Sequence, residues 1–173
     1  SRGLGDVYKR QARTQHSLVG LRCAISSRAL DAKLIVFPLF SAHGIPVLHP
    51  LSQCLGANEI LEVRGILNGT TNFILTQMLE FGQSYDAALK DAQARGYAEQ
   101  NPAADVDGID AGRKICILAA LSFGQHVYPD QVHTEGITEI TLEDVEYAKD
   151  WGGVIKLLGR ARKSEDGKHI YAI

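Results

Sequence analysis

The stretch that decides the fold runs from Gly65 to Gly82 and reads GILNGTTNFILTQMLEFG. Four of its side chains recur at the spacing of one helix face, and they are Thr71, Ile74, Leu75 and Met78. Gly82 follows the last turn, where glycine adopts the left-handed conformation that ends many helices. We therefore predict a helix over Asn68–Gly82.

The start of this helix permits two interpretations. Gly69 lets another group approach the backbone closely, and Thr70 and Thr71 place hydroxyl groups beside unpaired N–H groups that favour an anion. The alternative is plain N-capping by Asn68 or Thr70. The local sequence leaves both interpretations open.

Further elements are predicted on both sides of this stretch. Alternation of apolar and polar residues predicts a strand over Ile60–Leu67 with one face in water. Two more helices are predicted over Ser84–Gly96 and Ala111–Phe123. Nearly every residue from Ile115 to Leu121 is apolar, which predicts burial of the last helix on most sides. Toward the N-terminus, Pro46–Leu55 has a helical pattern and Leu34–Phe40 is an apolar, strand-like run.

The C-terminal third predicts a mixture of strands and one short helix. Strands are expected over Ile137–Thr141 and Val154–Arg162. Thr141 and Asp144 have the spacing of a capping box, which predicts a helix from there to Trp151. Asp166-Gly167 predicts a hairpin turn into a last strand, His169–Ile173.

Composition limits the classes of function. The chain has 173 residues, 45% of them hydrophobic, which suits one globular domain. A formal charge of −2 provides no overall positive field, so we expect neither nucleic acid nor an anionic membrane as a partner. The three cysteines are far apart and the six histidines lack metal-ligand spacing, so we expect no disulfide scaffold, no metal and a cytoplasmic location. No apolar run approaches the roughly 18 residues of a membrane helix.

The densest polar cluster lies between Tyr97 and Asp110, where a predicted loop carries four carboxylates within twelve positions. Lys114 follows Asp110 by four residues, so the two side chains can pair on one helix face. A lysine facing a pocket there becomes a usable proton donor or acceptor, because burial and nearby carboxylates adjust its pKa. A solvated cluster of charges at the start of a helix is the alternative, and the spacing does not exclude it.

Three motifs in a fixed order carry a resemblance to a known family. They are GILNGTTNFIL at Gly65–Leu75, AQARGYAE at Ala92–Glu99 and DVDGIDAGRK at Asp105–Lys114. Together they resemble the catalytic domain of homoserine dehydrogenase from about Ile45 to the C-terminus. The resemblance implies an α+β fold, with a mixed β-sheet and helices packed on one face. It also implies NAD(P)-dependent interconversion of L-homoserine and L-aspartate 4-semialdehyde, a step toward threonine, methionine and isoleucine.

The resemblance assigns roles to residues of this chain. Lys114 matches the proton donor, and Asp110 and Asp105 match partners that orient lysine and substrate. Glu99 matches the carboxylate that binds the substrate's α-ammonium group. Two further residues line the same pocket, and they are Thr70 and Tyr97. The residue types fit these roles, because carboxylates complement the amine of an amino acid and a helix N-terminus complements its carboxylate.

Some positions depart from the family pattern. Asn101 stands where an aspartate is usual, and Gly112 replaces an alanine at a small loss of helix propensity. The family holds a monovalent cation with a glutamate and backbone carbonyls before Gly44-Ile45-Pro46, and here Pro38 stands near the place of that glutamate. A monovalent cation is therefore possible but not supported by the residues.

The cofactor and the partners follow from the same resemblance. NAD or NADP is the implied cofactor, and a homodimer with a small amino-acid substrate is the implied assembly. No Gly-rich strand–turn–helix of the GxGxxG kind occurs in the sequence, so the cofactor-binding domain is expected to be absent and the isolated chain to be inactive.

We expect three segments along the chain. Residues 1–11 resemble a translated sequencing adapter and are expected to be a non-native leader, with a native basic arm as the alternative. The pattern leaves residues 12–44 undetermined. Residues 45–173 are expected to be a catalytic and dimerisation domain that is cut within its last strand. A non-catalytic module for dimerisation or amino-acid binding is the alternative to an enzyme fragment.

Overall fold

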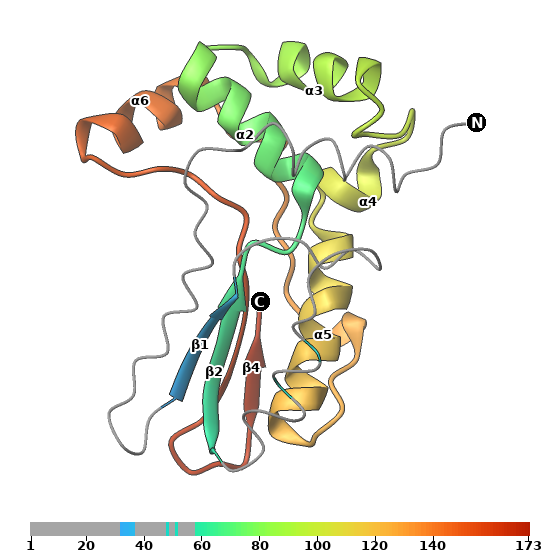
Figure 1. Cartoon of the computed structure of the whole chain (residues 1–173), viewed down its shortest axis with the longest axis vertical. Helices are drawn as coiled ribbons and strands as arrows, with labels where there is room; N and C mark the ends of the chain where they lie inside the picture. The colour runs from blue at the N-terminus through green and yellow to red at the C-terminus, as the bar shows by residue number, and fades with distance from the viewer. Residues whose placement is uncertain (1–31, 37–47, 49–50, 52–57) are drawn as a thin grey trace.

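The computed structural model describes residues 32–36, 48, 51 and 58–173 (Figure 1). The predicted leader over residues 1–11 lies outside the described residues. The structure also leaves out most of the segment over residues 12–44, including the cation site before Gly44. Of the helix predicted over Pro46–Leu55, it describes only residues 48 and 51. Within the described residues, no helix is both long enough and apolar enough to cross a membrane.

A mixed sheet of four strands forms one part of the fold. Its order is β1 (Ala32–Val36), β2 (Ile60–Gly65), β3 (Gly159–Lys163) and β4 (Ile170–Ala172). β1 pairs with β2 in parallel, whereas the other neighbours are antiparallel. The sheet therefore confirms the mixed topology and, with its helices, the α+β class.

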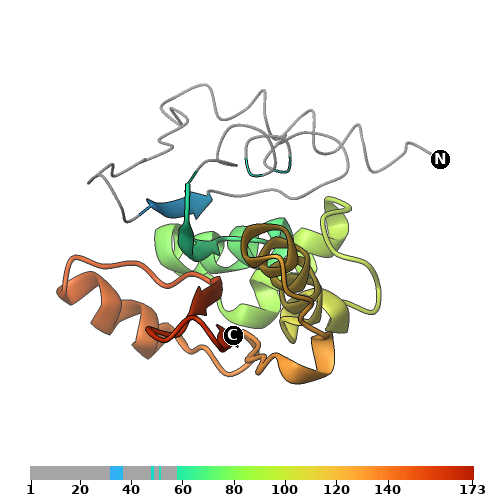
Figure 2. The ribbon, with the colours of Figure 1, turned by 90° about the horizontal axis from the view of Figure 1, so that it is seen from below.

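The helices form two groups. α5 (Ile109–Phe123) packs along the strands β2, β3 and β4, to one side of the sheet (Figures 1 and 2). α2 (Gly69–Phe81) continues from β2 beyond the end of the sheet, where it packs against α3 (Tyr85–Ala94) and α6 (Leu142–Asp150). Two short elements complete the described helices, and they are α4 (Ala103–Val106) and a 3-10 turn at Pro129–Gln131.

Two apolar cores correspond to these two groups. Between α5 and the sheet, Val63, Ile115 and Leu118 are fully buried. Among the helices at the end of the sheet, Ile74 and Met78 of α2 fill the centre of a second core. Apolar burial is the main contribution that stabilises such layers. Residues of β2 and α5 belong to the first core and residues of α2 to the second, so a core stabilises each end of the segment that joins β2 to α2.

The predicted helices α2, α3 and α5 are confirmed, with differences in burial. Gly82 and Gly124 end α2 and α5 in the left-handed conformation, at φ 65° and 68°. The predicted burial of α5 on most sides is wrong, because Ile117 and Leu121 are 51% and 45% exposed. α5 rests on the sheet with one face, so its other face remains open.

The polar face predicted for β2 is only partly confirmed. Arg64 is exposed as predicted, but Glu62 is buried, with 7% of its surface exposed. Its Oε2 accepts a hydrogen bond from Arg160 Nη2 of the neighbouring strand at 2.9 Å. An ion pair across the strands thus replaces contact with water.

The strand predicted over Ile137–Thr141 is wrong. This segment bonds to the end of α4 instead, since Ile137 N donates to Val106 O at 2.8 Å. The capping box that follows is confirmed, with Thr141 and Asp144 bonding reciprocally at the start of α6. The predicted loop from Tyr97 to Asp110 contains the short helix α4, and the strand predicted from Val154 begins only at Gly159.

Candidate active site

Asn68 caps the N-terminus of α2. Its Oδ1 accepts hydrogen bonds from the backbone N of Thr71 at 2.9 Å and from Thr71 Oγ1 at 3.0 Å. The backbone N of Asn72 also bonds to the Asn68 carbonyl. Of the two interpretations of this helix start, capping by Asn68 is confirmed.

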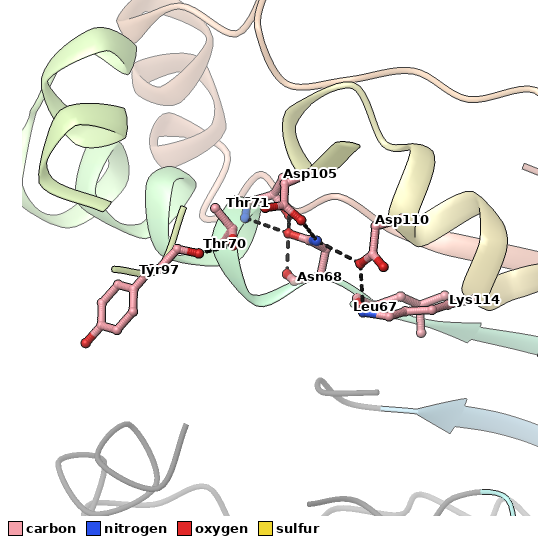
Figure 3. A network of polar contacts seen from close by, with 8 residues as sticks. All are labelled: Leu67, Asn68, Thr70, Thr71, Tyr97, Asp105, Asp110 and Lys114. Carbon is pink, nitrogen blue, oxygen red and sulfur yellow. Dashed lines mark hydrogen bonds and ion pairs between the residues drawn. The ribbon is translucent and has the colours of Figure 1, made fainter. Parts of the chain in front are cut away.

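The same side chain joins two carboxylates. Asn68 Nδ2 donates to Asp105 Oδ1 at 2.7 Å and to Asp110 Oδ2 at 2.9 Å (Figure 3). Sequence reasoning identified Asn68 only as a cap and missed this role. The contacts span 37 and 42 positions, and no spacing in the sequence indicates them.

Lys114 lies at one end of this network. Its Nζ donates to Asp110 Oδ2 at 2.7 Å and to the carbonyl of Leu67 at 3.0 Å. The predicted pair one helical turn apart is therefore formed. The Lys114 side chain is 22% exposed, so it is neither freely solvated nor sealed from water.

Thr70 and Tyr97 meet on the other side of Asn68. Thr70 Oγ1 donates to the carbonyl of Tyr97 at 2.8 Å. The Tyr97 ring packs edge-on against Phe73, with centroids 4.9 Å apart, and points away from the carboxylates (Figure 3). These two predicted residues thus contact each other through the main chain of Tyr97.

Glu99 is set apart from the network. Its backbone carbonyl accepts a hydrogen bond from Gln93 Nε2 at 3.1 Å, while its side chain is exposed. Its carboxylate makes no hydrogen bond or ion pair with the described residues. The structure therefore brings Lys114, Asp110 and Asp105 together through Asn68, whereas the Glu99 carboxylate lies outside this network.

A separate cleft of about 350 Å³ lies beside the first turn of α5. Its walls are mainly apolar, and neither Asp110 nor Lys114 lines it. Lys156 lines the cleft with its stem and donates from Nζ to Thr76 Oγ1 at 3.1 Å. Burial lowers the pKa of Lys156, an effect that nearby Glu80 opposes.

A metal and a dinucleotide are the two further ligands that a site of this kind could hold. The described residues contain no group of three or more histidine, cysteine or carboxylate side chains that could hold a metal. A dinucleotide phosphate would bind at a strand-to-helix turn such as β2–α2. There the Thr71 N–H is already bonded to Asn68, which removes one of the donors that a phosphate would use at this turn.

Comparison with known proteins shows the family of this chain. A family model for homoserine dehydrogenase matches residues 46–172. Homoserine dehydrogenase of Helicobacter pylori is 50% identical over 123 residues, which are 71% of this chain and 29% of that protein. The chain thus spans about three tenths of the length of such relatives.

Solved structures show the same likeness. A homoserine dehydrogenase from Thiobacillus denitrificans matches 74% of this chain and 30% of its own, at a TM-score of 0.70 and 46% identity. A hyperthermophilic archaeal homoserine dehydrogenase in complex with NADPH matches 73% of this chain and 35% of its own, at a TM-score of 0.57 and 30% identity. With the family model covering most of its length, the chain belongs to the homoserine dehydrogenase family.

Proposed function

We propose that this chain supplies the substrate-binding and proton-transfer part of an enzyme that interconverts L-homoserine and L-aspartate 4-semialdehyde. The observation that carries the proposal is the network in which Asp110 holds Lys114 and Asn68 joins Asp110 to Asp105. Family membership supports the reaction class. The cofactor of the proposed reaction is NAD or NADP, which the archaeal relative in complex with NADPH supports.

Lys114 is proposed to move a proton at the substrate oxygen. A lysine ammonium has three N–H donors, and Lys114 uses two of them on Asp110 and the Leu67 carbonyl. The third remains for the oxygen that becomes the alcohol in one direction and the carbonyl in the other. Asp110 keeps the ammonium in place for this transfer.

The remaining residues are proposed to hold the substrate. The unpartnered Glu99 carboxylate is the group that would bind the α-ammonium, and Asp105 would orient the substrate next to it. Thr70 and Tyr97 would form the wall beside them. We assign only substrate binding and proton transfer to the described residues, and no hydride step.

The assay that tests the role of Lys114 joins the chain to the dinucleotide-binding part of a relative and follows the absorbance of NADPH. We expect Lys114→Ala to lower turnover by a factor of about 10² to 10⁴ while homoserine still binds. Arg113→Ala is the matched control, because it removes an exposed cation from the preceding position. Parent-like turnover in Lys114→Ala would exclude this role.

Homoserine binding is tested separately by calorimetry on the 173-residue chain. We expect Glu99→Gln to weaken binding by about ten- to a hundredfold, because the ammonium loses an ionic partner. Glu139→Gln, which also neutralises an exposed glutamate, is the control. Equal affinity in both variants would contradict the assignment of Glu99. If the joined protein binds homoserine without turnover, the chain is instead an amino-acid-binding module.

We also propose a homodimer and a cytoplasmic location. Exposed apolar side chains on α5, at Ile117 and Leu121, support an interface on this helix. The free, buried thiol of Cys116 supports a reducing compartment. Sedimentation velocity tests the first point, since Ile117→Glu is expected to give monomers where the parent chain gives dimers.

A further inference from the structure

We propose that Asn68 is a positioning residue for Lys114, in addition to being the cap of α2. The proposal rests on the proposed function, because it concerns the group that would move the proton. Only 4% of Asn68 is exposed. Its side chain joins the start of α2 to Asp105 of α4 and to Asp110 of α5.

The orientation of the Asn68 amide is determined by its neighbours. Its oxygen faces two donors, the backbone N and the hydroxyl of Thr71, while its NH₂ group faces the oxygens of Asp105 and Asp110. An amide turned by 180° would oppose donor to donor and oxygen to oxygen. All four hydrogen-bonding positions of the amide are thus in use, in a single orientation.

This orientation fixes the carboxylate that holds Lys114. Asp110 Oδ2 accepts from Asn68 Nδ2 at 2.9 Å and from Lys114 Nζ at 2.7 Å. When Lys114 gives up its proton, its attraction to Asp110 weakens. The bond from Asn68 does not depend on that proton, because the amide stays neutral. Asn68 therefore keeps Asp110 in place in both protonation states of the lysine.

Asn68 also separates two negative charges. Asp105 and Asp110 each accept one hydrogen of the same NH₂ group, which therefore lies between the two carboxylates. The charged groups that meet here are Asp105 from α4 and the pair Asp110 and Lys114 from α5. The described part of the chain adds no further ion pair to them. An aspartate at position 68 would put a third carboxylate against the first two.

The test is Asn68→Asp in the 173-residue chain, with carboxylate and lysine carbons followed by NMR during a pH titration. The variant keeps the acceptor that caps α2, loses both amide donors and adds a negative charge. We expect the midpoint of Lys114 to rise by about one pH unit and the carboxylates to titrate at higher pH. Loss of a helix cap alone would change helix content and stability but not the Lys114 midpoint.

Asn101→Asp is the matched control. Asn101 is exposed, and its Oδ1 likewise accepts from a backbone N–H, that of Ala103 at 3.3 Å. The change adds the same charge and retains the same acceptor, but Asn101 has no contact with Lys114. We expect the titration midpoints of Lys114 and Asp110 to remain at their parent values.

A second variant applies if Asn68→Asp does not fold. Asn68→Ser retains a good capping residue but has no amide donor and no added charge. We expect it to fold, with the titration midpoint of Asp110 raised because one hydrogen bond to its ionised form is lost. Parent-like midpoints of Lys114 and Asp110 in a folded Asn68 variant would show that Asn68 is only a helix cap.

Adding homoserine to the same samples separates this proposal from the proposed function. If homoserine does not bind the parent chain but Asn68→Asp shifts the Lys114 midpoint, the proposed function fails and the positioning of Lys114 stands. If homoserine binds and the midpoint does not move, the positioning role fails and the proposed function stands.

Discussion

Lys156 donates a hydrogen bond to the hydroxyl of Thr76 at 3.1 Å, although 80 positions separate the two residues. The contact attaches the segment before β3 to the middle of α2. Its cost is the partial burial of an ammonium group, which lowers the pKa of Lys156. Stability should therefore depend on pH through this residue.

We predict that Lys156→Met raises the thermal unfolding midpoint at pH 7. Methionine keeps the apolar stem and removes the buried charge. In the parent chain, the unfolded state holds more protons than the folded state between the lowered pKa and the ordinary lysine value of 10.5. The parent's free energy of unfolding consequently rises with pH in that window. The difference in stability between Lys156→Met and the parent therefore becomes smaller as the pH rises.

Differential scanning calorimetry between pH 7 and 10.5 measures this effect. Lys90→Met, an exposed lysine on α3, is the control and should show no such convergence with the parent. A Lys156→Met variant less stable than the parent at pH 7 would mean that the bond to Thr76 outweighs the cost of burial.

A second prediction concerns Gly136. A Cβ atom there would overlap the carbonyl oxygen of Val106, the same oxygen that accepts from Ile137 N. Backbone cannot move aside as a flexible side chain can, so we expect Gly136→Ala to destabilise the chain by about 3 kcal/mol. Urea denaturation measures it. Gly153→Ala is the control, since its Cβ would lie 3.4 Å from the carbonyl oxygen of Ala148, which is an ordinary van der Waals distance.

Gly112 yields a third prediction. A Cβ at this position would lie 2.8 Å from Cγ2 of Thr134, so an alanine there requires the Thr134 side chain to shift. Gly112→Ala gains up to about 1 kcal/mol of helix propensity but meets that methyl group. Combining it with Thr134→Ser removes the methyl. In the same urea assay, we expect the double variant to be more stable than Gly112→Ala alone. Its free energy of unfolding should also exceed the value obtained by adding the effects of the two single changes.

The capping box of α6 carries a fourth prediction. Thr141→Ala removes the hydroxyl that accepts from Asp144 N at 3.2 Å and should cost about 1 kcal/mol at pH 7. Hydrogen bonds from the backbone and then the hydroxyl of Thr141 lower the pKa of Asp144. Their stabilisation is present above the ordinary aspartate value of 3.8 and is lost as pH falls through the lowered pKa.

The difference between Thr141→Ala and the parent should accordingly shrink in acid, as measured by circular dichroism during thermal unfolding. Thr138→Ala, an exposed threonine outside the helix, serves as the control. A difference that stays constant down to pH 2 would indicate that the capping box does not respond to the charge of Asp144.

The sequence predicted those parts of the fold that depend on neighbours in the chain. The apolar face of α2, its end at Gly82 and the pair of Asp110 with Lys114 all follow from spacings of a few residues. These features are local, so periodicity and capping rules are sufficient. The assignment of Glu99 and Asp105 to a substrate came from the resemblance alone and stays a prediction.

The parts that could not be predicted depend on distant residues. Glu62 looks like a solvated strand residue, yet it is buried because Arg160 lies beside it on β3. Residues 137–141 have the pattern of a strand, but the backbone N of Ile137 donates to the carbonyl of Val106 and not to a strand of the sheet. Asn68 follows the same rule, since its carboxylate partners come from two other helices.

The bond from the Thr71 amide to Asn68 has a practical consequence. That amide proton is protected from hydrogen exchange only while the Asn68 side chain holds its orientation toward Asp105 and Asp110. Its exchange rate therefore reports, from the backbone of α2, whether the group around Lys114 is assembled. A ligand that tightens this group would slow exchange at Thr71 without touching it, so one backbone resonance can monitor occupancy in solution.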